Sequence, residues 1–206
     1  MIQQNRTNRV RQMVKALNKD RKKQARQIDL LCHDLVDAQR AFVKRLETVG
    51  FAAGLYKSFL GVQDTEQILR ILVNEVQSEL PSMDVNFVFR EAEGCKIYPL
   101  ETTTRDEGHP VDAFDGALSE AVCKANKACD LDDLLGMGLA ISPQKASCIQ
   151  MKTLPLPQGG RSIGFVVLTS PATTKVPAQL IEKVTLVGSG ISQVVLATKK
   201  VNRSTL

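Results

Sequence analysis

The first fifty residues contain no proline, and their only glycine is Gly50 at the end. Within this segment apolar residues recur at alternating steps of four and three, from Val10 to Val49. A repeat that averages 3.5 residues keeps one stripe of a helix facing a partner helix. The segment therefore predicts a long amphipathic helix with coiled-coil character, which is only marginally stable without a partner.

The apolar stripe of this segment predicts a dimer interface. Nine of its twelve positions are apolar, and Arg21, Gln24 and Arg45 occupy the other three. A second stripe with the same spacing follows Pro177, so both terminal helices are candidates for packing between two copies. The predicted dimer seam comprises Ile28, Leu31, Leu35, Phe42, Val187, Ile191 and Val194.

Positive charge is concentrated at the start of the chain. Residues 1–26 carry nine Lys or Arg against the single Asp20, a balance of +8, whereas the whole chain has a net charge of +5. The rest of the chain therefore has a net charge of −3. The basic segment could contact a polyanion, but it lacks aromatic interleaving and any helix-turn-helix pattern. We therefore expect a solvated flank of the helix, not a nucleic-acid interface.

The composition allows one folded domain beside the helix. The chain has 206 residues and 43% hydrophobic content, which supplies one core and leaves residues for an extended element. We place the basic coiled-coil helix at residues 1–54 and the domain at residues 55–206. The polar N-terminus has no signal-peptide core, and no apolar run approaches the roughly 20 residues of a membrane span. These features predict a cytoplasmic protein.

The middle of the chain predicts a helix followed by a hairpin. Three glycines from Gly50 to Gly61 interrupt the helical pattern, and Asp64–Gln67 then offers a new helix start with acidic and polar residues in its first turn. Helical spacing continues until Pro81. Two short runs separated by a turn follow, the first rich in β-branched and aromatic residues. The predicted strands are Val85–Arg90 and Cys95–Leu100.

The second half of the chain repeats this alternation. A polar loop at residues 101–112 precedes a predicted helix, and a segment rich in proline and glycine at residues 155–160 joins two further strands. The predicted elements are a helix at Ala113–Lys127, strands at Ser147–Leu154 and Ser162–Thr169, and a helix after Pro177. Runs of antiparallel strands beside helices predict an α+β fold, a central antiparallel sheet with helices on one face.

Four segments of this pattern resemble a known family. Asp64–Leu69 is similar to its first helix, and Val85–Phe89 is similar to its first strand. Lys145–Met151, a short turn and then Ser162–Leu168 are similar to its last hairpin, whose second strand opens with an Ile-Gly pair. On these residues the chain resembles the GAF family over about residues 55–200. The resemblance implies a central antiparallel sheet with a ligand pocket over one face and flanking helices that commonly dimerise.

The resemblance leaves the ligand, and any cofactor, unknown. Cyclic-nucleotide-binding relatives carry an Asn-Lys pair after the last strand, where this chain has Thr169-Ser170-Pro171. Bilin-binding relatives attach the chromophore through a pocket cysteine beside histidine, but Cys32-His33 lies in the long helix. From the order of the elements, the residues expected to line the pocket are Phe87, Phe89, Tyr98, His109, Phe114 and Met151.

The sequence contains no catalytic constellation. It has two histidines and five scattered cysteines without a CxxC pair, so no nucleophile is coupled to a base. His33-Asp34 resembles a histidine-kinase phosphoacceptor box, yet no nucleotide-binding motif accompanies it. Cys123 and Cys129 could sense redox state near the pocket, although the aspartates that follow them disfavour a thiolate. These aspartates, Asp130 to Asp133, lack the glycine and terminal glutamate of an EF-hand loop. We expect no metal site and no enzymatic activity.

Two functions fit these observations. The first is a dimeric sensory or regulatory module, in which a small ligand in the pocket shifts the packing of the terminal helices. The second is a non-enzymatic adaptor or scaffold whose pocket is vestigial and whose basic helix binds a partner protein or a polyanion. The aromatic content of 4% makes an aromatic ligand cage less favourable and keeps this second function open.

Overall fold

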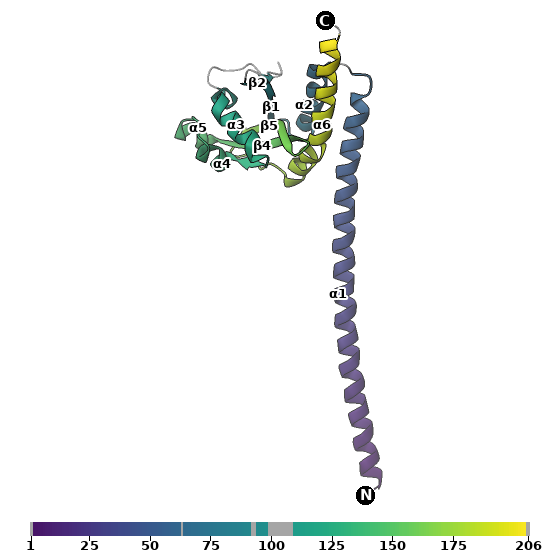
Figure 1. Cartoon of the computed structure of the whole chain (residues 1–206). Coiled ribbons are helices and arrows are strands. Elements are labelled where there is room, and N and C mark those ends of the chain that lie inside the picture. Colours follow the sequence, from purple (N-terminus) through teal and green to yellow (C-terminus); the bar gives the residue numbers. More distant parts are fainter. Residues whose placement is uncertain (1, 63, 92–93, 99–108, 205–206) are drawn as a thin grey trace. The chain divides into compact units, whose positions relative to one another are not determined.

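A computed structural model describes the backbone of residues 2–62, 64–91, 94–98 and 109–204, and the side chains of residues 9–198 within these ranges. The chain divides into two compact units, Met1–Glu47 and Thr48–Leu206. The first unit is part of one helix, and the second holds the remaining elements (Figure 1). Each unit is described by itself below.

The long helix α1 extends further than the glycines predict. It spans Ile2–Phe59 and runs through Gly50 and Gly54 without a break. Each helical glycine costs up to about 1 kcal/mol relative to alanine, which burial of neighbouring side chains can outweigh. In the second unit, Ala52, Leu55 and Phe59 of α1 are buried in the hydrophobic core, so packing at the end of the helix compensates for the glycines.

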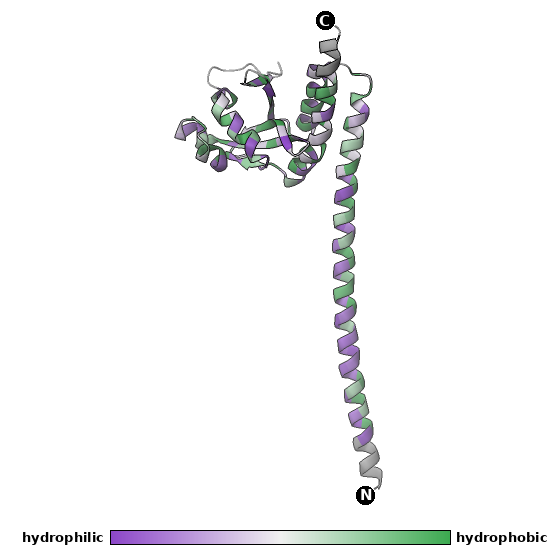
Figure 2. Ribbon diagram, viewed as in Figure 1, coloured by the Kyte–Doolittle hydropathy of each residue, from purple (hydrophilic) through white to green (hydrophobic). Residues whose placement is uncertain are grey.

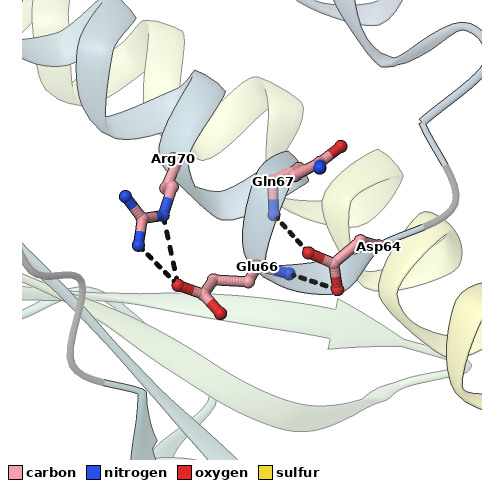
Figure 3. A network of polar contacts seen from close by, with 4 residues as sticks. All are labelled: Asp64, Glu66, Gln67 and Arg70. Atoms are coloured by element: carbon pink, nitrogen blue, oxygen red, sulfur yellow. Dashed lines mark hydrogen bonds and ion pairs between the residues drawn. The ribbon is translucent and has the colours of Figure 1, made fainter.

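The helix α2, Thr65–Glu79, begins where the sequence predicts. Asp64 is its N-cap, and the Asp64 carboxylate accepts hydrogen bonds from the backbone N–H groups of Glu66 and Gln67 at 3.3 Å each (Figure 3). These bonds satisfy two N–H groups that have no partner within the helix. One turn later, Arg70 Nη2 donates to Glu66 Oε1 at 2.7 Å on the exposed side.

The sheet has five strands in the order β2-β1-β5-β4-β3, and every neighbouring pair is antiparallel. The strands are β1 Asp84–Glu91, β2 Gly94–Tyr98, β3 Cys129–Asp130, β4 Ile149–Gln158 and β5 Arg161–Pro171. Successive side chains of a strand point to opposite faces, so β1 and β5, which lie inside the sheet, supply two cores. Phe87 and Phe89 pack on one face, and Val88 packs on the other.

One face of the sheet is covered by α2, by the end of α1 and by the last helix, α6, Ala178–Ser204 (Figure 1). Polar contacts join α2 to α6, because Thr65 Oγ1 lies 2.7 Å from Thr198 Oγ1 and Lys183 Nζ lies 2.5 Å from Glu79 Oε1. Gly190 of α6 lies against the Tyr56 ring of α1, where a Cβ atom would overlap the ring. This first core is therefore built by helices from both ends of the chain.

The opposite face is covered by a second group of elements. They are a 3-10 turn at Pro110–Ala113, α3 Gly116–Ala125, α4 Leu131–Gly136 and α5 Pro143–Cys148. Val111, Phe114, Leu118 and Leu134 from these elements pack against Val88 and the other strand residues of this face. The expectation of helices on one face alone is therefore wrong, because the alternating side chains of β1 and β5 are apolar on both faces.

The sequence did not predict β3, α4 or the start of α5, and the other differences from the predicted elements lie at segment ends. Ser147 and Cys148 belong to α5, not to a strand, because Ser142 caps this short helix and Pro143 fits its first turn. β4 continues through Pro155 and Pro157, which the sequence assigned to a turn. β3 pairs with β4 at Lys152 and Thr153. Beyond these residues that side of β4 has no neighbouring strand in the described part of the chain, so a proline there does not break a hydrogen bond between strands.

The predicted fold class is confirmed in its main features. The chain forms an α+β structure with a central antiparallel sheet flanked by helices and a long N-terminal helix. One helix, α6, is long and apolar enough to cross a membrane over Ala178–Thr198, contrary to the expectation that no such run exists. Its apolar side is occupied within the second unit, where Leu180, Val184 and Val195 are buried in the first core.

Candidate functional site

A polar group lies on the face of the sheet that carries α3 and α4. Asp84 and Asn86 alternate with the side chains of the first core, so they share the opposite face with Val88. Asp84 Oδ2 accepts a hydrogen bond from Asn86 Nδ2 at 2.7 Å and lies 2.9 Å from His109 Nε2. The carboxylate of Asp84 thus joins the first strand to the residue just before the 3-10 turn.

The hydrogen bonds of His109 fix the role of its ring. The backbone N–H of Val111 donates to Nδ1 at 3.3 Å, so the ring proton must lie on Nε2, which faces Asp84. Both ring nitrogens are therefore engaged, and neither is placed to act as a general base. The arrangement orients His109 and anchors the 3-10 turn on the sheet.

Two buried hydroxyls at the end of β5, those of Thr169 and Ser170, have no hydrogen-bond partner in the described part of the chain. Because successive side chains of a strand alternate, only Thr169 shares the face of Asp84. Thr169 is the cross-strand neighbour of Asp84 on one side and of Met151 on the other. A buried hydroxyl without a partner costs about 1–3 kcal/mol, so this end of β5 favours a polar group that can pair with it.

A cavity of about 360 Å³ opens next to Met151. It is formed by the edge strand β3, its neighbour β4, one residue of β5, the beginning of α4 and the beginning of α6. Its lining residues are Asp130, Leu131, Asp132, Ile149, Gln150, Met151, Lys152, Leu168, Val176 and Ile181. The lining combines both signs of charge with aliphatic side chains, a composition that suits a small polar molecule with an apolar part.

The aspartates of this cavity have a structural role that the sequence did not predict. Asp130 is the N-cap of α4 and accepts from the Asp133 N–H at 3.0 Å, while Asp133 accepts from the Asp130 N–H at 3.3 Å. This reciprocal pair is a capping box. Among the described residues, no group of three or more His, Cys, Asp or Glu side chains is placed to hold a metal ion.

The cysteines near the site are neutral thiols. Burial raises the pKa of Cys123 to about 11, and burial also raises the pKa values of Cys95 and Cys129. Since the thiolate is the reactive form, these residues are poor nucleophiles at neutral pH.

The six predicted pocket residues do not converge on one cavity. Phe87, Phe89 and Tyr98 pack in or against the first core, on the side of α2 and α6. Phe114 and Met151 belong to the second core, and Met151 also lines the cavity. The structure therefore brings Met151 and His109 to the same face through Thr169 and Asp84, and it places the three aromatic residues of β1 and β2 on the other face.

The predicted seam residues also separate into two groups. Ile28, Leu31, Leu35 and Phe42 on α1 are exposed in the single chain. On α6, Val187 and Ile191 are fully buried and Val194 packs against the first core. The stripe of α6 is thus placed inside the folded unit, because its apolar side chains cover the sheet. The stripe of α1 stays a predicted seam.

The sheet order, the helices on both faces and the cavity together define the class of fold. The chain has a GAF-like fold, as the sequence resemblance predicts. No family model matches the sequence, and no curated protein matches it.

Three solved structures show this likeness. The GAF domain from a phosphoenolpyruvate-protein phosphotransferase of Coxiella burnetii has 10% identity and a TM-score of 0.54, with 78% of this chain and 98% of that chain covered. The GAF domain from the Acinetobacter phosphoenolpyruvate-protein phosphotransferase has 10% identity and a TM-score of 0.53, with 76% and 98% covered. Residues 122 to 287 of a methyl-accepting chemotaxis protein have 14% identity and a TM-score of 0.52, with 73% and 98% covered.

Proposed function

We propose that the chain is a dimeric sensory or regulatory module that binds a small ligand and signals through its terminal helices. The observation that carries this proposal is the continuity of α1. One helix holds both an exposed apolar stripe and, in its last turns, Ala52, Leu55 and Phe59 of the first core. A change in that core therefore acts directly on the helix that carries the predicted seam.

The exposed stripe supports pairing with a second copy. Figure 2 shows hydrophobic and hydrophilic residues interspersed along α1. The exposed apolar side chains of its stripe are Val10, Val14, Leu17, Ile28, Leu31, Leu35, Phe42 and Val49. Burying a leucine side chain contributes about 1.5–3 kcal/mol, so covering this stripe would supply the stability that a single long helix lacks.

The proposed ligand site is the 360 Å³ cavity beside Met151. Its polar lining side chains come from β3, β4 and the start of α4. A polar ligand can pair with charged side chains such as Asp132 and Lys152, while Ile181 of α6 contacts its apolar part. This last contact offers a route from the ligand to a terminal helix.

The similar structures come from signalling and regulatory proteins, a methyl-accepting chemotaxis protein and two phosphoenolpyruvate-protein phosphotransferases. They support a sensory or regulatory function for this chain. We further propose that it acts in the cytoplasm with a signalling partner and without catalysis of its own. No group of residues in the described part of the chain argues for catalysis, since both nitrogens of His109 are engaged and the buried cysteines have raised pKa values.

The dimer is tested by Leu31→Asp, with Leu30→Asp as its matched control. The two leucines are exposed to 67% and 65% in the single chain, but only Leu31 lies on the stripe. A buried aspartate without a partner is costly, so Leu31→Asp should weaken the dimer at least about tenfold. Leu30→Asp should leave it nearly unchanged. Light scattering after size-exclusion chromatography measures the mass of each variant, and circular dichroism checks its helicity.

Three outcomes contradict the dimer. The first is an intact chain with the mass of one copy, and the second is an equal loss of dimer in both variants. The third is a Leu31→Asp variant that remains fully dimeric. A monomeric wild-type chain would favour the second function, an adaptor in which the apolar stripe and the cations of α1 bind a different protein or a polyanion.

A further inference from the structure

A second pocket, separate from the cavity beside Met151, is lined by three cationic side chains from three elements, Arg90 of β1, Lys124 of α3 and Arg161 of β5. It measures about 230 Å³ and lies where the end of β1, the end of α3 and the start of β5 meet. Its lining residues are Arg90, Cys123, Lys124, Asn126, Gly160, Arg161 and Ser162. None of these residues is acidic, so the walls of the pocket carry charge of one sign.

The positive charge of this pocket is only partly compensated. Arg90 Nη2 and Lys124 Nζ each lie 3.4 Å from the same Glu120 carboxylate oxygen, so two cations share one anion. Arg161 has no ion-pair partner among the residues that the structure describes. The pocket therefore has a surplus of about two positive charges, which a doubly charged anion would balance.

The floor of the pocket strengthens its attraction for an anion. Cys123 and Ser162 are buried, and the Ser162 hydroxyl donates to the Gly164 carbonyl oxygen. A dry floor lowers the local dielectric constant, and this makes each charge interaction stronger than in water. The chain outside residues 1–26 has a net charge of −3, so these cations are a local concentration and do not reflect a basic domain.

We propose that this pocket binds the phosphate group of a small phosphomonoester. Guanidinium groups present planar pairs of N–H donors that match phosphate oxygens, and Arg90 and Arg161 supply two of them from neighbouring strands. The volume holds roughly eight water-sized groups, at about 30 Å³ each, which exceeds the need of a bare phosphate. The spare room fits a short organic group beside the phosphate.

Isothermal titration of the full chain with glycerol 3-phosphate tests this site. Uncharged glycerol is the control ligand and should not bind. Arg161→Gln should weaken binding of glycerol 3-phosphate at least about tenfold, because it removes one positive charge and the paired N–H donors that match phosphate oxygens. Arg161→Lys keeps the charge but loses the paired donors, so its affinity should lie between those of the wild type and Arg161→Gln.

The matched control variant is Arg70→Gln, which removes the same charge from α2, outside this pocket. It should bind glycerol 3-phosphate as tightly as the wild type. Equal affinities of wild type and Arg161→Gln would overturn the proposal and would assign any binding to other cations, such as those of residues 1–26. Absence of binding by the wild type at millimolar glycerol 3-phosphate would also overturn it. Neither result depends on the oligomeric state, so this test is independent of the proposed dimer.

Discussion

At the scale of single residues, Gly164 is a glycine of β5 whose Cα lies too close to β1 for a side chain. A Cβ atom added there would overlap the carbonyl oxygen of Val88 and lie 3.0 Å from the Phe89 Cα atom, both in the backbone of β1. A paired strand cannot move aside without losing its register. Gly164→Ala should therefore lower the free energy of unfolding by about 1–3 kcal/mol, measured by urea denaturation.

Gly116→Ala is the matched control for this substitution. Gly116 is the first residue of α3, and a Cβ atom added there meets nothing within 4 Å. Because alanine restricts the unfolded chain and favours a helix, this variant should be as stable as the wild type or slightly more stable. Similar losses in both variants would show that the close approach of β1 and β5 is not the cause.

The residues of the site show how far a sequence predicts a pocket. The sequence placed Met151 and His109 near a ligand, and the structure brings them to one face of the sheet. The sequence did not reveal Asp84 as the partner of His109, because that contact joins residues far apart in the chain. The alternation of β1 indicated that Phe87 and Phe89 share a face, but it could not say which helices cover that face.

At the scale of elements, the start of α2 offers a test of capping. Asp64→Ala removes the acceptor of two backbone N–H groups (Figure 3), which should cost about 1 kcal/mol of stability. Arg70→Gln removes the exposed pair with Glu66 on the same helix and should cost about 0.5 kcal/mol or less. Chemical denaturation of both variants compares the two effects, and an equal or larger loss for Arg70→Gln would contradict the role of the cap.

The elements with strong local signals were predicted well, and those decided by distant contacts were not. The strand Val85–Arg90 lies within β1, and the helix that begins after Asp64 is α2. The glycines of α1 and the prolines of β4 misled the prediction of segment ends. In α1 the burial of Leu55 and Phe59 outweighs local propensity, and in β4 the prolines lie where β3 no longer pairs.

At the scale of the whole molecule, the end of α1 belongs to the folded second unit, which begins at Thr48. A chain that starts at Thr48 keeps Ala52, Leu55 and Phe59 and should unfold cooperatively. A chain that starts at Leu60 loses these three buried side chains. Removing each large one costs about 2–5 kcal/mol, which approaches the typical total stability of a domain.

Thermal unfolding followed by circular dichroism compares the two shortened chains. We expect a sharp transition for the chain that starts at Thr48 and a lower or absent transition for the one that starts at Leu60. The domain boundary predicted at residue 55 lies between these two starting points. It would remove the buried Ala52 and the partly buried Phe51 from the first core and keep Leu55 and Phe59. Identical melting curves for both chains would show that the last turns of α1 contribute nothing to the fold.

The side chains of β5 point alternately to the two faces of the sheet, so this one strand contributes to both hydrophobic cores. Phe165 and Val167 are buried among the residues under α3 and α4, whereas Val166 and Leu168 are buried with α1, α2 and α6. Consecutive residues of β5 thus pack in different cores, and a single peptide unit links a side chain of one core to a side chain of the other. A rigid planar peptide transmits displacement without a relay of side chains. Any molecule that pushes the strand from one side therefore presses it against the helices on the other.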